Sequence, residues 1–208
     1  EKNKKEQLNK KYQAAVAKLA KEKKQRQKLL AEIKQKKTNR LATIKYLKAA
    51  SVKMDKTINS LRRGSTPEPE DINTFYAYQG LLKMPVNGNV ISKYGKYVEP
   101  HSGASNFRNG IEIQSRPGTP IRAVFSGQTI FSSWLKGYGN VIIIAHGKNY
   151  HTVYAHAEEL FRSKGEKVEA GEVIATVGDT GAMNGPTLYF EIRHQGNPVD
   201  PLEWINHS

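Results

Sequence analysis

The first 63 residues contain neither glycine nor proline, although the chain of 208 residues has 17 glycines and nine prolines. This segment consists mainly of Lys, Gln, Ala, Leu, Glu and Arg, which all favour helices. Its apolar residues recur three and four positions apart, as on one narrow face of a helix. A lone polar helix has little to stabilise it, so the sequence predicts a helical arm over 1–63 that belongs to a coiled coil.

The positive charge of the chain lies in this arm. Residues 1–63 hold 21 Lys and Arg against five Asp and Glu, a net charge of +16, whereas residues 64–208 hold 12 against 14, a net charge of −2. Lysine runs attract polyanions, but the arm lacks the interleaved aromatics and base-reading modules of nucleic-acid-binding proteins. We expect no nucleic-acid partner, and a partner helix or an anionic envelope surface stays open for the arm.

The helical pattern ends at the stretch RRGSTPEPEDINTF. Gly64 ends the helix, and the two prolines that follow cannot continue it. We interpret 64–83 as a linker. Within it, INTFYAYQGLL has the composition of a short amphipathic helix, which we expect to cover a groove of the following domain.

From residue 84 to 208 the pattern changes to short β-rich runs between glycine turns, such as NVISKYG, GIEIQS and NVIIIAHG. Runs spaced about 8–12 residues apart without intervening helices predict an antiparallel all-β domain. The fold class is therefore α+β, with a long coiled-coil helix before the β domain.

The chain has no cysteine, which excludes disulfides and thiolate metal sites. No apolar run approaches the roughly 20 residues of a membrane span, and the start at Glu1 suggests a processed or truncated soluble fragment.

The blocks GIEI, GTPIRAVFSG, GYGNVIIIAHG, YAH, VEAGEVIATVGDTG and GPTLYFEIR occur in an order that resembles the LytM-type (lysostaphin-like) zinc peptidases, which cleave cell-wall peptides. In that family, two histidines and an aspartate hold zinc, and further histidines act on water and substrate. Here the corresponding former metal or catalytic positions carry Arg108, Glu112, His156, Thr187 and Tyr189.

These residues do not suit zinc catalysis. A catalytic zinc needs three protein ligands and an open position, but a guanidinium such as that of Arg108 has no lone pair to give. The phenol of Tyr189 stays protonated near neutral pH. We therefore expect no catalytic residue, no metal and no cofactor, and we expect a non-enzyme.

The strand TLYFEIR alternates between two faces, with Leu188, Phe190 and Ile192 on one side and polar-capable side chains on the other. We expect the second face to line an emptied substrate groove that binds a protein partner, since Tyr and Arg are enriched in binding hot spots. The residues expected in this groove are Tyr189, Arg193, Tyr138, Val141, Tyr154, Arg108 and Asn109.

With the helical arm in front, the domain is most similar to the EnvC-type murein hydrolase activators. That resemblance implies a non-catalytic periplasmic protein at the division site, which activates a peptidoglycan amidase through the groove. It also implies that the coiled coil docks to an FtsEX-type membrane complex. Direct contact with peptidoglycan stays open. The alternatives are a peptidoglycan-binding module and a zinc endopeptidase with unusual ligands.

Overall fold

The computed structural model describes residues 2–63, 75–98, 103, 105–182 and 185–206. A single helix, α1 (Lys2–Arg63), confirms the helical prediction for the first segment. The chain divides into two compact units at residues 48 and 49, so the last turns of α1 belong with the β domain. This boundary lies inside the helix, about 15 residues before the one expected from the glycine and prolines. None of the described helices is long and apolar enough to cross a membrane.

The described residues of the second unit, Ala49–Ser208, form twelve strands and two short 3-10 helices besides the end of α1. Their bounds are η1 Phe75–Tyr78, β1 Asn89–Ser92, β2 Gly95–Val98, β3 Ser105–Arg108, β4 Ile111–Gln114, β5 Pro120–Arg122, β6 Gly127–Leu135, β7 Gly139–Ala145, β8 Tyr150–Leu160, β9 Lys167–Val168, β10 Val173–Val177, β11 Thr187–His194, β12 Asn197–Val199 and η2 Pro201–Glu203.

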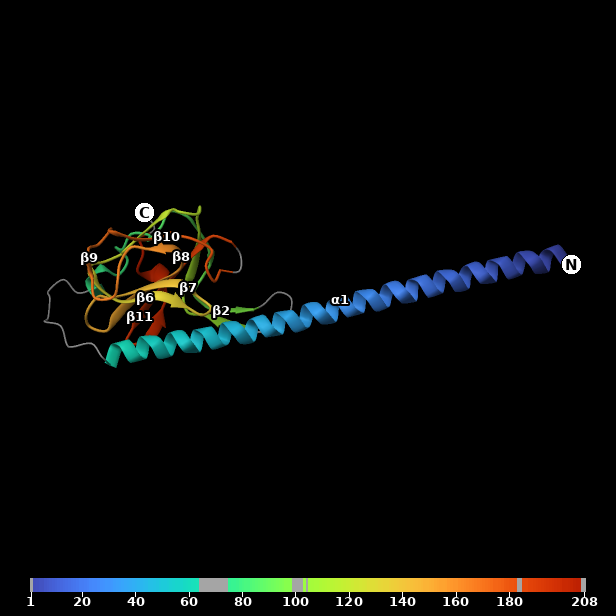
Figure 1. Ribbon diagram of the computed structural model, residues 1–208, viewed down its shortest axis with the longest axis horizontal. Coiled ribbons are helices and arrows are strands. Elements are labelled where there is room, and N and C mark those ends of the chain that lie inside the picture. Colours follow the sequence, from blue (N-terminus) through green and yellow to red (C-terminus); the bar gives the residue numbers. More distant parts are fainter. Residues whose placement is uncertain (1, 64–74, 99–102, 104, 183–184, 207–208) are drawn as a thin grey trace. The chain divides into compact units, whose positions relative to one another are not determined.

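Ten of the described strands form one sheet, whose main path runs β1-β4-β11-β8-β7-β6-β9. Figure 1 labels the long strands β6, β7, β8 and β11 of this sheet. β10 pairs with β5 and β8, β12 pairs with β11, and β2 and β3 form a separate hairpin. All these strand pairs are antiparallel, which confirms the predicted antiparallel β domain. The long strands β6, β7, β8 and β11 lie next to one another and carry the site described below.

Alternation along these strands sends side chains to two faces with different cores. One face holds the main core, which includes Ile142 and Ile144 of β7, Tyr154 of β8, and Phe190 of β11. The other face holds a second cluster, which includes Val141 and Ile143 of β7, Val153 and Ala155 of β8, Tyr189 of β11, and three residues of α1. The sheet therefore has apolar partners on both faces.

The segment expected to cover a groove contacts the main core instead. Residues 64–74 lie outside the described residues, but η1 follows directly. Phe75 of η1 is buried and stacks on Trp204 and His146, with ring centroids 4.9 and 4.8 Å apart. Leu82 continues the contact, because its backbone N–H donates to the carbonyl of Trp204 at 3.1 Å.

A buried hydroxyl joins the main core to a neighbouring loop. The Tyr154 hydroxyl accepts hydrogen bonds from the Val124 N–H at 3.0 Å and from the Thr152 hydroxyl at 3.2 Å.

We predict that Tyr154→Phe lowers the free energy of unfolding by about 1–3 kcal/mol, because it leaves a buried N–H without an acceptor. Urea denaturation followed by circular dichroism measures this. The control is Tyr150→Phe, and equal stability of Tyr154→Phe and wild type would contradict the prediction.

Candidate functional site

Strand β11 carries the residues on which the sequence interpretation depends most. Leu188, Phe190 and Ile192 lie in the main core, as their alternation predicts. The other face of β11 carries Thr187, Tyr189, Glu191 and Arg193, and all four of these side chains are buried. They do not line an open cleft in this structure, because a segment of the same chain lies over them.

The covering segment is the end of α1. Met54 and Ile58 of α1 are fully buried, Ala50 is nearly so, and all three pack against the second face of the sheet. Residues spaced four apart lie on one side of a helix, so this segment turns a single apolar stripe toward the strands. The sheet residues in this cluster are Leu135, Tyr138, Val141, Ile143, Val153, Ala155 and Tyr189.

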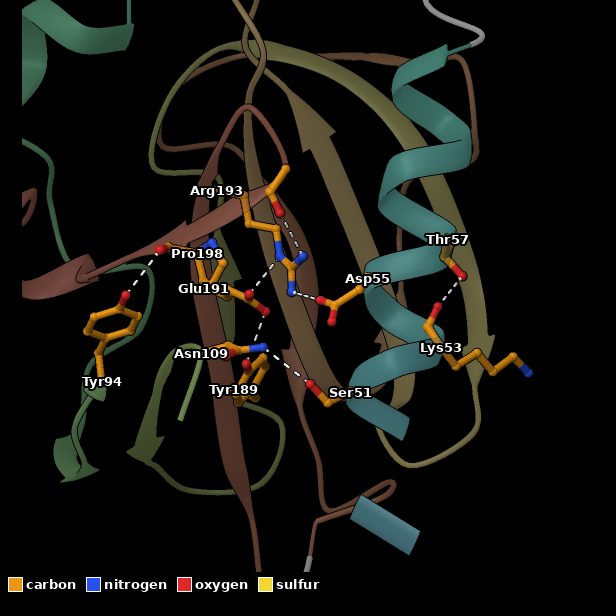
Figure 2. A network of polar contacts seen from close by, with 11 residues as sticks. Ser51, Lys53, Asp55, Thr57, Tyr94, Asn109, Tyr189, Glu191, Arg193 and Pro198 are labelled. Atoms are coloured by element: carbon orange, nitrogen blue, oxygen red, sulfur yellow. Dashed lines mark hydrogen bonds and ion pairs between the residues drawn. The ribbon is translucent and has the colours of Figure 1, made fainter. Parts of the chain in front are cut away.

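Polar contacts fix the helix beside this apolar stripe (Figure 2). The Arg193 guanidinium donates through Nε to Glu191 at 2.6 Å, through one terminal nitrogen to the Gly196 carbonyl at 3.1 Å, and through the other to Asp55 of α1 at 2.7 Å. The Asn109 side chain reaches Ser51 of α1 at 3.3 Å. The helix end is thus held by the Asp55 ion pair and the Ser51 hydrogen bond as well as by apolar packing.

The charges in this network are strongly coupled. Glu191 is 0% exposed, and desolvation raises its pKa to about 7, although Arg193 acts in the opposite direction. Burial alone would lower the pKa of Arg193, but Glu191 and Asp55 raise it above its ordinary value. Burial also raises the pKa of Tyr189, whose hydroxyl donates to Glu191 at 3.0 Å. Arg193 is therefore a fixed cation that lies between two carboxylates.

Four of the five former metal or catalytic positions lie close together in the structure. Tyr189 pairs with Glu112 across β11 and β4, and its ring centroid lies 6.0 Å from that of His156. His156 contacts the Thr187 hydroxyl through Nδ1 at 3.2 Å, and burial lowers its pKa to about 4. Unlike these four residues, Arg108 stacks over the Tyr97 ring, 3.6 Å from its centroid.

The residues at these positions do not fit a zinc ion. Glu112 already accepts a hydrogen bond from Ser92 at 2.9 Å, and the Tyr189 phenol is protonated and donates to Glu191. Within the described part of the chain, no three His, Asp or Glu side chains are grouped closely enough to hold a metal. A catalytic zinc needs three such ligands.

The remaining predicted groove residues divide into two groups. Tyr138 and Val141 lie in the cluster under α1, and the Tyr138 ring meets that of Tyr189 edge-on at 5.2 Å. Asn109 reaches α1 through Ser51. Tyr154 does not belong to the groove. It faces the main core, because its neighbours Val153 and Ala155 occupy the other side of β8.

Sequence reasoning missed the helix residues of this site. Met54 and Ile58 belonged to the apolar stripe that was expected to pack on a partner helix, and no role was expected for Ala50 or Asp55. The available signal was the spacing of Met54, Ile58 and Leu61, which differs in no way from the rest of the stripe. Only the fold shows that this part of the stripe packs on a sheet.

The buried carboxyl makes helix docking sensitive to pH. Glu191 lies near Tyr189 and Arg193 on β11, Asp55 on α1 and Tyr138 after β6. On β8, Val153 is opposite Glu191 and His151 is opposite Arg193. The pKa of Glu191 is about 7 in the docked state, above the value of 4.5 expected when the side chain is solvated. Between pH 4.5 and 7 the docked state therefore keeps a proton that the solvated side chain loses. The stabilisation of the docked state by this proton is complete below pH 4.5 and is lost as the pH rises through 7.

We therefore predict that α1 docks more weakly at pH 8 than at pH 6, by about 1–3 kcal/mol. Both values lie above the lowered pKa values, about 4, of the buried His146 and His156. The measurement is hydrogen exchange of residues 49–63 in wild type and in Glu191→Gln at both pH values. Glu191→Gln should remove the difference, and a pH effect of the same size in both proteins would contradict the assignment to Glu191.

Comparison with known proteins identifies the β domain. Residues 106–201 match the family described as peptidase family M23. The murein hydrolase activator EnvC of Escherichia coli is 32% identical over 166 residues, which are 76% of this chain and 39% of that protein. The murein hydrolase activator NlpD of the same organism is 37% identical over 112 residues, which are 53% of this chain and 29% of that protein.

A solved structure supports the same relationship. A zinc-containing peptidase from Vibrio cholerae matches with a TM-score of 0.55 and 29% identity, covering 60% of this chain and 40% of that one. The chain spans less than half the length of EnvC and of NlpD. The family match, the two activators and the shared fold lead to one conclusion: the β domain is a peptidase family M23 (LytM-type) domain, homologous to those of the EnvC and NlpD murein hydrolase activators.

Proposed function

We propose that this protein is a non-catalytic activator of peptidoglycan amidases, and that it binds an amidase through the face of β6, β7, β8 and β11 that α1 covers. The observation that carries the proposal is the replacement of the family's zinc chemistry by an apolar face with one buried arginine. Named homologues of the chain are murein hydrolase activators, which supports a role in promoting peptidoglycan hydrolysis. Activity in cell division and separation of daughter cells is part of the same proposal.

The face has the composition of a protein-binding surface. Tyr138 and Tyr189 offer two aromatic rings in edge-on contact, and Arg193 offers a guanidinium held in place by Glu191. Tyr and Arg dominate binding hot spots because they combine large contact area with polar groups. The apolar strand residues between them form a floor on which a helix already packs.

The covering helix implies that the protein is self-inhibited. Ala50, Met54 and Ile58 occupy the face, so an amidase has access only after this segment leaves. Among the contacts that hold the segment are the apolar side chains of Ala50, Met54, Ile58 and Leu61, the Asp55 ion pair and the hydrogen bond to Ser51. Asp55 keeps 42% of its side chain exposed, which limits the strength of that pair. Opening the face must expose Met54 and Ile58 and break this pair, so a second interaction elsewhere on the protein has to supply that free energy.

The cellular setting is also a proposal. Relatives of the chain include lipoproteins, among them an NlpD/LppB homolog of Pseudomonas aeruginosa that is 36% identical over 127 residues. This is compatible with a periplasmic, envelope-associated protein. We propose that it acts at the division site, with the arm of α1 docking to an FtsEX-type membrane complex and the β domain engaging the amidase and, during catalysis, the peptidoglycan.

The proposal predicts that releasing the end of α1 from the sheet increases activation of the amidase. Ile58→Asp places a charge in the apolar cluster, so it should expose the face and raise amidase stimulation severalfold. Val52→Asp is the matched control, because Val52 lies on the same turns of α1 but is 51% exposed. The measurement is release of soluble fragments from peptidoglycan by a periplasmic amidase. Equal stimulation by both variants and wild type would show that the helix does not control access.

The second prediction tests the face itself in the opened protein. In the Ile58→Asp background, Tyr138→Ala or Tyr189→Ala should weaken amidase binding by about 1–3 kcal/mol, because each removes a hot-spot ring. Lys148→Ala, on an exposed turn, is the control. Calorimetry gives the affinity and urea denaturation the stability. Unchanged binding by folded variants, together with sedimentation on peptidoglycan, would favour a wall-binding module instead.

A further inference from the structure

An asparagine is followed by a glycine three times in the chain, at 87–88, 109–110 and 184–185. In such a pair the side-chain carbonyl carbon of asparagine can meet the backbone nitrogen of the next residue, because glycine has no Cβ to block the approach. Attack by this nitrogen releases the side-chain amide as ammonia. Asn184 lies outside the described residues, which leaves Asn87 and Asn109 to be compared.

Asn109 differs from Asn87 because it contacts the end of α1. The side-chain nitrogen of Asn109 donates to the Ser51 hydroxyl at 3.3 Å, and the residue is only partly exposed (Figure 2). Asn87 and Gly88, in contrast, are both exposed. Two identical dipeptides therefore stand in different surroundings, one against the helix and one in solvent.

Packing requires glycine at position 110. A Cβ there would lie 2.4 Å from the Phe190 carbonyl oxygen and 3.1 Å from both the Glu191 Cβ and the Tyr189 ring. The nearest of these atoms belongs to the backbone of β11, so a larger residue does not fit unless the sheet moves. The fold therefore keeps, directly after Asn109, a backbone nitrogen that no side chain of its own residue shields.

We propose that Asn109 is a site of spontaneous deamidation, and that docking of α1 sets its rate. The Gly110 nitrogen loses its proton and forms a bond to Asn109 Cγ, while the bond from Cγ to the side-chain nitrogen breaks and ammonia leaves. The product of this step is a cyclic succinimide. Water then opens the ring at either carbonyl and gives aspartate or isoaspartate. Nothing is oxidised or reduced, and water is the co-reactant.

Docking of α1 restrains the first step. The hydrogen bond to Ser51 fixes the orientation of the Asn109 side chain, whereas attack requires this side chain to turn until Cγ meets the Gly110 nitrogen. When the helix end leaves the sheet, the bond to Ser51 is lost and the side chain turns freely. Release of α1 therefore speeds the reaction. This inference rests on the docked helix itself and does not depend on amidase activation.

The product changes the charge of the covered face. A carboxylate at position 109 can still accept a hydrogen bond from Ser51, since a hydroxyl both donates and accepts. It adds a negative charge, however, on the side of α1 that carries Ser51 and Asp55. Asp55 and Glu191 already share the Arg193 guanidinium. Isoaspartate also adds a main-chain atom beside the tight contact with β11. Both products weaken docking, so each release of the helix makes the next one easier.

The full chain contains its own reference for the experiment. Peptide mapping by mass spectrometry at mildly alkaline pH follows conversion of Asn109 and Asn87 in the same sample. In concentrated urea the two should react at similar rates, and in the folded wild type Asn109 should be slower. Ser51→Ala removes the hydrogen bond and should speed conversion of Asn109 about two- to tenfold, without a change at Asn87. Ser60→Ala is the matched control, because the Ser60 hydroxyl donates within the helix, to the Thr57 carbonyl at 2.7 Å.

Release of the helix provides a second test. Ile58→Asp should speed conversion of Asn109 at least as much as Ser51→Ala does. An intact Asn109 in both variants after Asn87 has been converted would overturn the proposed site. Equal rates at Asn109 in wild type and in both variants would overturn its dependence on α1.

The effect of the product is measured with the charge already in place. Asn109→Asp should increase hydrogen exchange of residues 49–63 about two- to fivefold over wild type, because like charges repel. Asn87→Asp makes the same substitution away from the helix and should leave the exchange unchanged. Equal exchange in wild type and Asn109→Asp would overturn the proposed weakening of docking.

Discussion

The fully desolvated ion pair between Arg193 and Glu191 is the constraint on which the functional face depends. Two side chains that are 1% and 0% exposed cannot keep their charges unless each has a partner, and the strand alternation of β11 places them side by side. Their mutual contact leaves one guanidinium nitrogen for Asp55 and one carboxylate oxygen for Tyr189. The pair therefore connects the end of α1, through Asp55, with the orientation of Tyr189.

The same pair explains how the former metal positions keep a defined shape. In a metal-dependent relative, bound zinc draws its ligands together. Here Tyr189 stands opposite Glu112 and near His156, but the tyrosine is held by Glu191 rather than by a metal. Hydrogen bonds to Glu191 order the Tyr189 and Arg193 side chains of β11. In the proposed function, the neighbouring apolar strands serve as the contact surface.

Part of this arrangement is predictable from local sequence. The absence of Gly and Pro predicts α1, the period of two on β11 predicts Leu188, Phe190 and Ile192 as core, and motif order predicts the domain. Tyr154 was placed on the wrong side because alternation alone does not say which face of β8 is the groove. The role of Met54 and Ile58 was not predictable either. It depends on contacts between residues more than 70 positions apart, such as those with Val141 and Val153, and the stripe itself is compatible with any apolar partner.

The docked helix end also affects the solubility of the protein. It shields a continuous apolar floor formed by Leu135, Val141, Ile143, Val153 and Ala155, which soluble proteins rarely leave in contact with water. When the helix leaves, this floor meets solvent until another molecule covers it. In the open form that we propose, this uncovered floor would favour association with other molecules, so the lifetime of that form would depend on how soon a binding partner or the helix covers it again.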